Sequence, residues 1–374
     1  MVRFGIVGLG TIANHYMKLV CRGSVSGASI AALCSRNEAK LSQAVEHYPL
    51  LQGVSGYTDY NQMISSGQID AVLICTPHGL HPSMSLQAIQ AGLHVLTEKP
   101  VGVSTDEVDN VLSELEARPQ LRCGVLYNRR ASRVYQYVKD LVSSGTLGEL
   151  IRATWIITDL YRADAYYQSS PWRGSWSGEG GGLLMTQASH QLDLMQWICG
   201  MPNRLWARCS TVDRPIQTEN EAELFFTYPN GANGQFIASA HECPGVNRLE
   251  LCGTRGSITI QNDTDVSLVY LNEDERAFAK TNGSPFAKVS YKKSAVHFEL
   301  EENATQHIST IQNFVDAVER GTPLLCPLAE GLRSLQIIHS AYVSQVTHQE
   351  TPVPVSEAVF QQFLSKQKYI ESQK

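Results

Sequence analysis

The chain has 374 residues, and its 30 Lys and Arg against 36 Asp and Glu give a formal net charge of −6. This length allows two ordinary domains with a sizeable core. The mild acidity and the lack of any Lys/Arg-rich run argue against a general nucleic-acid binder. No apolar stretch reaches the roughly 18–20 residues of a membrane helix, and the start of the chain lacks the features of a signal peptide. We therefore expect a folded cytoplasmic protein with no nucleic-acid or membrane partner.

The cysteines indicate the same compartment. There are nine, an odd number, and no two of them form a CxxC pair. Several lie inside apolar runs, as Cys34 and Cys75 do. Buried free thiols in a reducing compartment explain this pattern better than a disulfide framework or a zinc site.

The first third of the chain alternates strand and helix patterns. Apolar runs predict strands over residues 2–8, 29–34, 71–75, 94–96 and 121–126. Helical spacing of apolar residues predicts helices over residues 11–21, 38–48, 83–91 and 106–116. Buried strands separated by amphipathic helices imply a parallel sheet covered on both faces, which the right-handed crossover rule makes doubly wound. We assign this α/β domain to residues 1–122.

The pattern changes in the second domain, which we assign to residues 123–374. Strand-like segments are expected over residues 149–158, 205–212, 222–228, 234–240, 249–252 and 257–260. Helices are expected over residues 134–143, 188–199, 305–319 and 329–345, followed by a polar helical tail. Turn signals separate several of the strands. The second domain is therefore expected to be α+β, with a large and mostly antiparallel sheet.

A glycine motif opens the first helix. Gly8-Leu9-Gly10-Thr11-Ile12-Ala13 is a GxGxxA sequence directly after a strand. Its first glycine allows a tight turn, its second lets the backbone approach a pyrophosphate, and its alanine lets helix and strand pack closely. The phosphates would meet the helix N-terminus. This context favours dinucleotide binding over a plain small-residue turn.

The end of the second strand bears on the choice of cofactor. A site for NAD usually has an acidic residue here, whereas this chain offers Ser35 and Arg36, which suit a 2′-phosphate. Arg36 could instead be a solvated loop residue or stack on the adenine, and Glu38 could turn back to the ribose. NADP is therefore favoured modestly, and NAD stays open.

Two further motifs close the third and fourth predicted strands. His78 and His81 lie three residues apart, and helix capping explains them better than a metal site, since no third ligand is nearby. Lys99 stands between Glu98 and Pro100, which restrict it. A partly buried lysine can move protons, although a structural ion pair with Glu98 is the simpler alternative.

The second half has a glycine-rich segment before a helix. Gly180-Gly181-Gly182 is followed by His190 and Asp193, which share one helical face. His190 is a candidate acid/base and Asp193 a candidate orienter, although a structural histidine is about as common in a helix. The glycines let a ligand or another backbone come close.

Four motifs stand in order: GxGxxA, CTPHxxH, EKP and GGGxLxxxxxHxxD, at residues 8–13, 75–81, 98–100 and 180–193. Together with the Tyr127–Arg130 segment and the helix around residues 314–321, they resemble the Gfo/Idh/MocA family of NAD(P)-dependent oxidoreductases. The resemblance implies a Rossmann domain followed by a domain with a large, mostly antiparallel sheet. It also implies a substrate that is a sugar, a polyol or a related cyclic alcohol.

The resemblance gives roles to particular residues. Lys99 would lie beside the nicotinamide and the reacting oxygen, and His190 would transfer protons. Thr186 stands where many relatives carry Asp or Asn, and a threonine cannot serve as a base, which shifts weight to Lys99 and His190. Residues 171–176 resemble the loop that reaches back over the cofactor. The tyrosines before it, Tyr161, Tyr166 and Tyr167, would suit a sugar or ordinary loop packing equally.

The expected site residues are as follows. Cofactor binding is assigned to Gly8, Gly10, Thr11, Ile12, Ser35, Arg36, Thr76, Pro77, His78, His81, Glu98, Lys99, Asn128, Trp172 and Arg173. Substrate binding is assigned to Lys99, Tyr167, Thr186, His190 and Asp193, with Lys99 and His190 catalytic and no metal required.

We therefore expect hydride transfer between nicotinamide and a secondary alcohol of a sugar-like ring. One alternative is an NAD-dependent glycosidase that oxidises its substrate transiently, and another is a non-catalytic regulator that binds the cofactor as a signal. Residues such as Phe225 and Ile237 leave apolar positions on both faces of the second sheet. We expect one of these faces to form a homodimer or homotetramer.

Overall fold

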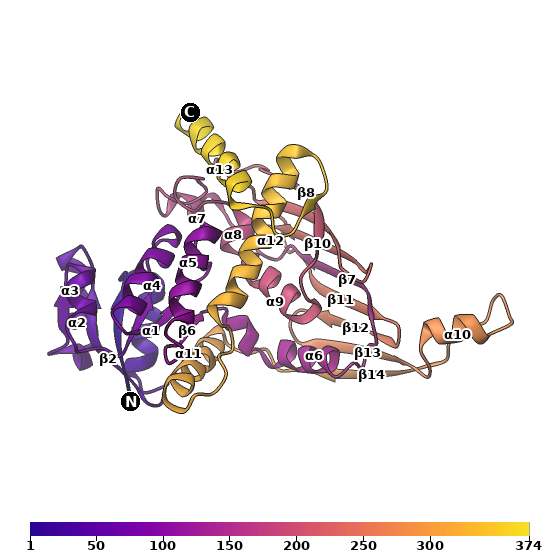
Figure 1. Cartoon of the computed structure of the whole chain (residues 1–374), viewed down its shortest axis with the longest axis horizontal. Coiled ribbons are helices and arrows are strands. Elements are labelled where there is room, and N and C mark those ends of the chain that lie inside the picture. Colours follow the sequence, from indigo (N-terminus) through magenta and orange to yellow (C-terminus); the bar gives the residue numbers. More distant parts are fainter. Residues whose placement is uncertain (374) are drawn as a thin grey trace. The chain divides into compact units, whose positions relative to one another are not determined.

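The structure is a computed structural model that describes residues 1–373 (Figure 1). The chain divides into two compact units. Unit 1 contains Met1–Ala131 and Glu302–Leu335, and unit 2 contains Ser132–Glu301 and the chain from Gln336 onward.

Unit 1 is built on a six-stranded sheet in the order β3-β2-β1-β4-β5-β6, with every strand pair parallel. Its strands are β1 (Val2–Val7), β2 (Ala28–Cys34), β3 (Ser55–Tyr57), β4 (Ala71–Ile74), β5 (His94–Thr97) and β6 (Cys123–Val125). Its helices are α1 (Thr11–Cys21), α2 (Glu38–His47), α3 (Tyr60–Ile64), α4 (His81–Gln90), α5 (Thr105–Glu116) and α11 (Asn303–Arg320). The strand order reverses between β1 and β4, which is the switch point of a doubly wound sheet. The expected Rossmann fold is confirmed.

Local sequence explains where several of these helices begin. The side chains of Asn37, Asp59 and Ser104 accept backbone N–H groups from the first turns of α2, α3 and α5. Each such cap satisfies one of the N–H groups that a helix leaves without an intrahelical partner. The sequence reading missed β3 and α3, because runs of three and five residues are too short to show a period.

Helix α11 completes the core of unit 1. Its side chains Ile311, Phe314 and Val315 are buried in one cluster with residues of the sheet, such as Phe4. The rings of Phe4 and Phe314 lie 5.9 Å apart. A segment from late in the chain therefore covers apolar side chains of the first strand.

Unit 2 is built on a nine-stranded sheet in the order β14-β13-β12-β11-β7-β10-β9-β8-β15. Its strands are β7 (Leu150–Ile157), β8 (Arg204–Ser210), β9 (Glu221–Thr227), β10 (Asn233–Ser239), β11 (Asn247–Gly253), β12 (Gly256–Gln261), β13 (Asp265–Leu271), β14 (Tyr291–His297) and β15 (Thr351–Pro352). Its helices are α6 (Arg133–Ser143), α7 (Asp164–Gln168), α8 (Leu183–Thr186), α9 (Ser189–Cys199), α10 (Glu275–Thr281) and α13 (Glu357–Ser372), while α12 (Leu328–Thr347) begins in unit 1 and ends in unit 2. Only β10 and β7 pair in parallel, so the expected mostly antiparallel sheet is confirmed.

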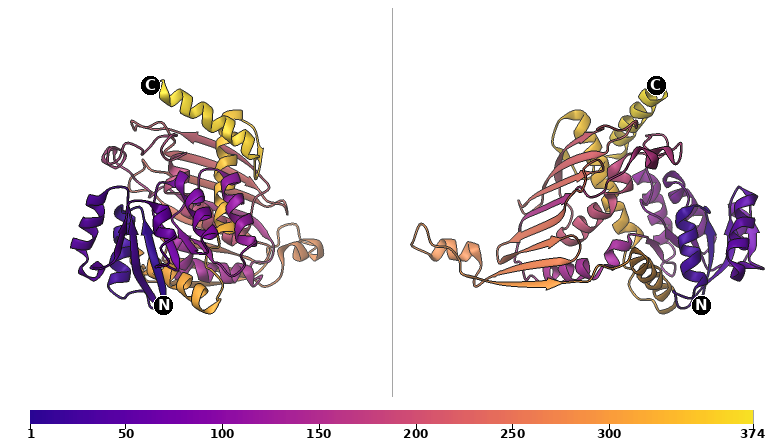
Figure 2. Two further views of the ribbon diagram at one scale, coloured as in Figure 1. Left: turned by 60° about the vertical axis from the view of Figure 1, so that its left-hand side comes forward. Right: turned by 180° about the vertical axis from the view of Figure 1, so that it is seen from behind.

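The two faces of this sheet differ in exposure. Leu224, Phe226 and Phe236 are buried on one face, while Phe225 is 43% exposed on the other. The ring of Phe225 lies 5.7 Å from that of Trp206 on the neighbouring strand. Helices α6 and α9 lie on one side of the sheet (Figure 2).

The sequence reading also missed β13, β14 and α10. Strand β14 is exposed along nearly its whole length, so its sequence has no buried apolar face to reveal it. Helix α10 lies in an arm that projects past the ends of β13 and β14 (Figures 1 and 2). No helix within residues 1–373 is long and apolar enough to cross a membrane.

Candidate active site

The glycine turn after β1 has the geometry that the motif predicts. Gly8 has a φ of 87°, and a Cβ on it would lie 2.7 Å from the carbonyl oxygen of Cys75, so no larger residue fits. A Cβ on Gly10 would meet nothing within 4 Å. The first glycine therefore shapes the turn, and the second leaves the backbone open.

Helix α1 begins at this open position. No side chain caps its N-terminus, and the buried Ala13 lets its first turn pack on the sheet. The N–H groups of that turn have no intrahelical acceptor, and the helix end carries a partial positive charge. These features fit the pyrophosphate of a dinucleotide.

Ser35 and Arg36 follow the carboxyl end of β2, at the same sheet edge as the glycine turn after β1. The hydroxyl oxygen of Ser35 accepts the N–H of Asn37 at 3.2 Å, so its own proton remains available. Arg36 is exposed, and within residues 1–373 its side chain forms no ion pair. Both side chains are therefore accessible to a ligand at the ribose position.

His81 links two strand ends instead of lying open to a ligand. Its ring is fully buried, with Nδ1 2.8 Å from the carbonyl oxygen of Pro100 and Nε2 2.7 Å from that of Thr76. Burial lowers the pKa of His81, and the two carbonyl acceptors oppose that change. His81 thus joins the loop after β4 to the turn after β5, and its expected contact with a cofactor stays a prediction.

Tyr16 of α1 helps to hold the Glu98-Lys99 turn in place through a hydrogen bond to Glu98. The Glu98 carboxylate accepts the hydroxyl proton of Tyr16 on Oε1 and the backbone N–H of Lys99 on Oε2, the latter at 3.1 Å. Burial raises the pKa of Glu98, and the hydrogen bond from Tyr16 and the charge of Lys99 oppose the rise. The turn that carries Lys99 is therefore held by a buried carboxylate.

Two histidines near this turn were not predicted from the sequence. His15 Nε2 lies 3.1 Å from His307 Nδ1, and the His307 ring packs edge-on against Tyr16. Burial is the main cause that lowers the pKa of His307 to about 4, and the charges of His15 and Lys99 add to it. The ring is therefore neutral at pH 7. No motif marks this pair, because its members lie on α1 and α11.

The side chain of Asn128 forms hydrogen bonds within unit 1, and its expected contact with the cofactor stays a prediction. Asn128 is 3% exposed, and its Nδ2 donates to Asn303 at 2.9 Å and to Gln306 at 3.3 Å. The buried guanidinium of Arg130 donates to the Leu325 carbonyl at 3.1 Å and pairs with Glu330. These contacts bind the segment after β6 to the chain around α11 and α12.

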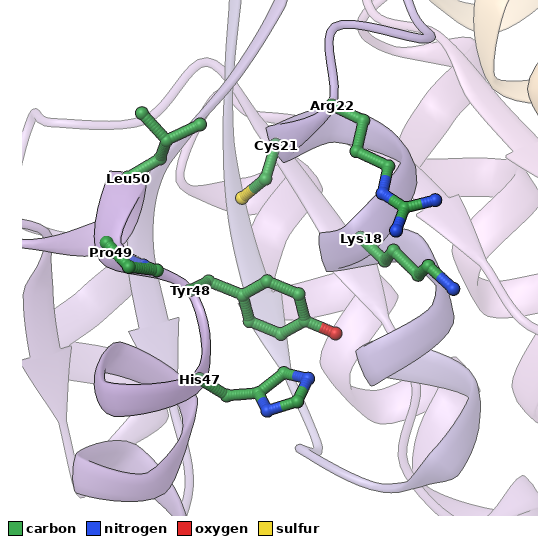
Figure 3. Close-up of a pocket in the computed structure, with 7 residues that line it drawn as sticks. All are labelled: Lys18, Cys21, Arg22, His47, Tyr48, Pro49 and Leu50. Atoms are coloured by element: carbon green, nitrogen blue, oxygen red, sulfur yellow. The ribbon is translucent and has the colours of Figure 1, made fainter.

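A surface hollow of about 400 Å³ lies at the C-terminal ends of α1 and α2 (Figure 3). Its lining residues are Lys18, Cys21, Arg22, His47, Tyr48, Pro49 and Leu50. Lys18 and His47 occupy the last turns of the two helices, where cations are favoured by the helix dipole. The hollow is therefore at the end of these helices away from the glycine turn.

In unit 2, the glycine-rich segment packs against its own fold. A Cβ on Gly182 would lie 2.0 Å from the carbonyl oxygen of Glu219, and one on Gly181 would lie 2.3 Å from the hydroxyl of Tyr342. The close approach that the glycines permit is therefore made by another backbone and a tyrosine of the same unit.

The Glu219 carboxylate holds the start of α8. It accepts the N–H groups of Gly182 and Leu184 at 3.0 and 2.9 Å, and the hydroxyl of Tyr342 at 2.8 Å. The residue is 4% exposed, and burial raises its pKa to about 7 despite these donors. No sequence pattern indicated Glu219, since its partners are distant in the chain.

Three side chains at the junction of α8 and α9 form a polar edge. Thr186, Gln187 and His190 are half-buried, whereas the residues between them are buried. Asp193 is fully buried and accepts Gln196 Nε2 at 3.1 Å. His190 is therefore accessible and Asp193 is enclosed, and the substrate contact expected for Asp193 stays a prediction.

Gln187 connects this edge to the tyrosine segment. Its Nε2 donates to the Tyr166 hydroxyl at 2.8 Å, and its Oε1 accepts the hydroxyl of Thr186 at 2.8 Å. Arg173 also donates to the Tyr166 hydroxyl, at 2.6 Å, and its guanidinium lies 4.7 Å from the ring centre of Trp172. The expected cofactor contacts of Arg173 and Trp172 stay predictions.

Tyr166 and Gln187 had no assigned role in the sequence analysis. Tyr167 packs edge-on against Tyr166 with ring centres 5.1 Å apart, and its hydroxyl forms no hydrogen bond within residues 1–373. In the same range, no group of three or more His, Cys, Asp or Glu side chains is arranged to hold a metal.

Two family models match this chain. The oxidoreductase family with an NAD-binding Rossmann fold matches residues 2–127, and the Gfo/Idh/MocA C-terminal domain matches residues 135–259. The protein therefore belongs to the Gfo/Idh/MocA family and is an oxidoreductase with an NAD-binding Rossmann unit. This confirms the resemblance seen in the four motifs.

Individual relatives are distant. Oxidoreductase P35 of Formosa agariphila is 30% identical over 72% of this chain and 83% of its own. Myo-inositol 2-dehydrogenase of Thermotoga maritima is 22% identical over 91% of this chain and 95% of its own. The structure of the WlbA dehydrogenase from Bordetella pertussis with NADH and UDP-GlcNAcA is 23% identical, with a TM-score of 0.76 over 95% of this chain and 99% of that one. The likeness to the WlbA structure shows that this chain has the same fold.

The packing of the glycine-rich segment predicts a stability effect. Gly182→Ala should destabilise the protein by about 1–3 kcal/mol, because its Cβ cannot fit against the Glu219 carbonyl. Gly283→Ala is the control, since a Cβ there meets nothing within 4 Å. Thermal unfolding should give a lower Tm for Gly182→Ala alone, and equal Tm values would contradict the close packing.

Proposed function

We propose that the protein transfers a hydride between a nicotinamide cofactor and a secondary alcohol or ketone of a sugar, polyol or sugar derivative. The observation that supports the proposal is that Lys99 follows β5 at the same sheet edge as the glycine turn after β1, with β4 between the two strands. The carboxyl ends of parallel strands share an edge, so the turns after β1 and β5 lie on the side where such sheets bind ligands. The inositol dehydrogenases among the relatives support an alcohol substrate.

Lys99 has the chemistry for the proton that accompanies hydride transfer. In oxidation its amine would accept the hydroxyl proton of the substrate, and in reduction its ammonium would return it. Glu98 holds its backbone in place through a 3.1 Å hydrogen bond. The nicotinamide, when bound, supplies the hydride chemistry itself.

His190 is proposed as the second group in proton transfer. It is the half-buried ionisable residue on the polar edge of α8 and α9, beside Thr186 and Gln187. An imidazole can accept and release a proton near pH 7. Thr186 has no such capacity, and its hydroxyl lies 2.8 Å from Gly182 O.

We also propose that the protein modestly prefers NADP to NAD. Ser35 has a free hydroxyl proton, and Arg36 is exposed with no acidic residue between Ala31 and Asn37. A charge-assisted contact from Arg36 to a 2′-phosphate would contribute roughly 1.5–3 kcal/mol. NADH is the cofactor in the WlbA structure, so NAD remains the competing choice.

The protein is also proposed to form a homodimer or homotetramer. Trp206 and Phe225 lie together on the less buried face of the unit 2 sheet, 36% and 43% exposed. Adjacent exposed aromatic side chains favour contact with a second copy.

Lys99→Ala should lower kcat by about two to four orders of magnitude, because an acid/base group is lost. Affinity for the nicotinamide cofactor, followed by fluorescence titration, should change much less. Lys18→Ala removes a lysine of the same unit outside the proposed site and should retain full activity. Near-normal turnover of Lys99→Ala would refute its catalytic role.

His190→Ala should lower kcat and remove a limb of the pH–rate profile near neutrality. His47→Ala, an exposed histidine at the end of α2, serves as the control. If kcat and the pH profile both stay as in the wild type, His190 is a structural residue.

Steady-state kcat/KM with NADP and with NAD tests the role of Arg36. Wild type should prefer NADP by about tenfold, which corresponds to about 1.4 kcal/mol, and Arg36→Ala should lose that preference. Arg22→Ala should leave it intact. A preference for NAD, with both cofactors affected alike by Arg36→Ala, would show that Arg36 does not bind a phosphate.

Phe225→Glu should shift the protein to a smaller assembly, because the new carboxylate would be desolvated at an interface. Light scattering at micromolar concentration measures the mass. A monomeric wild type would exclude the proposed oligomer, and an unchanged oligomer in Phe225→Glu would place the interface elsewhere.

A further inference from the structure

Tyr166 lies between two arginine side chains in unit 2. The guanidinium carbon of Arg173 is 4.3 Å from the centre of its ring, and that of Arg162 is 5.2 Å away. A third arginine, Arg214, donates to the backbone carbonyl of Arg162 at 2.9 Å. The segment before the glycine-rich region thus gathers cationic groups around one phenol.

The hydroxyl group of Tyr166 has a hydrogen-bond donor that is not used within residues 1–373. Its oxygen accepts two hydrogen bonds, from Arg173 Nη1 at 2.6 Å and from Gln187 Nε2 at 2.8 Å. A phenol oxygen has two lone pairs, so both are used and the O–H must point elsewhere. Within residues 1–373 no acceptor receives this proton. With both lone pairs used, the hydroxyl of Tyr166 can act only as a hydrogen-bond donor to a ligand.

Arg162 has a similarly incomplete set of partners. It is half-buried, and its Nη1 donates to the carbonyl oxygens of Leu160 and Tyr161 at 3.3 and 2.8 Å. It forms no ion pair within the described chain, although the other two arginines do. Arg173 faces Glu179 at 3.9 Å, and Arg214 faces Asp164 at 3.5 Å. Among the three arginines, Arg162 is therefore the one without an ion pair in residues 1–373.

These donors border the polar edge that contains His190. Gln187, which donates to Tyr166, is the residue after Thr186 and is bonded to its hydroxyl. His190 follows three residues later on the same half-buried edge. A substrate that reaches His190 would thus lie close to the Tyr166 donor.

We propose that Arg162 and Tyr166 bind an acidic substituent of the substrate, a carboxylate or a phosphate. The donor set is the reason: Arg162 and Tyr166 offer N–H and O–H groups and no free acceptor. A carboxylate or phosphate accepts hydrogen bonds from both, and pairs with a guanidinium in a charge-assisted contact. A sugar hydroxyl would leave its own proton without an acceptor here. The inference rests on the proposed function, because it takes the substrate to be the sugar-like molecule acted on beside His190.

The test measures binding separately from turnover. The full-length protein with NADH is titrated calorimetrically with three pairs of neutral and acidic probes: glucose and glucuronate, galactose and galacturonate, and N-acetylglucosamine and its 1-phosphate. The acidic member of at least one pair should bind ten times more tightly or better. Arg162→Gln should remove that preference, and Tyr166→Phe should weaken the acidic member about tenfold or more while leaving the neutral one unchanged.

Two controls isolate the effect. Arg208→Gln removes an exposed arginine of the same unit and should keep the wild-type preference, and Arg162→Lys retains the charge and should keep part of it. Tyr161→Phe removes a hydroxyl of the same segment that forms no hydrogen bond within residues 1–373, and it should have no effect.

The outcomes separate the two proposals. No preference for the acidic member in any pair, or a preference that survives in Arg162→Gln, would overturn this inference. Binding that depends on Arg162, without any reduction of NAD⁺ or NADP⁺ when the same probes are incubated with each oxidised cofactor, would support the acidic-group site and count against the proposed dehydrogenase reaction.

Discussion

The approach of the Gly8 turn to the Cys75 carbonyl is the constraint on which unit 1 depends. Strand β1 pairs in parallel with β2 on one side and β4 on the other, so the chain must turn sharply above β4 as it leaves β1. A Cβ at Gly8 would lie 2.7 Å from the Cys75 carbonyl oxygen, which excludes every other residue. The same turn leaves the start of α1 uncapped and open. The open start of α1, which is the candidate pyrophosphate site, therefore follows from the way three strands meet.

Buried carboxylates play a comparable part in both units. Glu98 receives Tyr16 and the Lys99 backbone in unit 1, and Glu219 receives the start of α8 and Tyr342 in unit 2. A buried carboxylate is costly unless several donors satisfy it, so each one specifies the conformation of its donors. The turn held by Glu98 carries Lys99, and the segment held by Glu219 leads to His190. Both are candidate proton-transfer residues.

The sequence was informative where a pattern is local. The apolar runs of β1 and β4, the period of α1 and the GxGxxA turn depend on neighbours in the chain, and all are in the structure. Tyr16, Glu219, Gln187 and His307 were not found, because each matters through a partner that only the tertiary fold supplies. Tyr16 and Glu98 are 82 residues apart, and Glu219 and Tyr342 are 123 apart. Strand β14 was missed because it is exposed along nearly its whole length, whereas β13 carries a local alternation, with Val266 and Leu268 buried, that was overlooked.

The late position of α11 affects how the protein is synthesised. Residues Glu302–Leu335 belong to unit 1, and Phe314 fills its core beside Phe4. At about 5–20 residues per second, translation from Ala131 to the end of α11 takes on the order of ten to forty seconds. During that interval the nascent first unit has apolar surface that its last helix has not yet covered. A ribosome-bound chain would therefore expose a site for chaperones at its N-terminal unit, and this unit would complete its core only when most of the second had emerged.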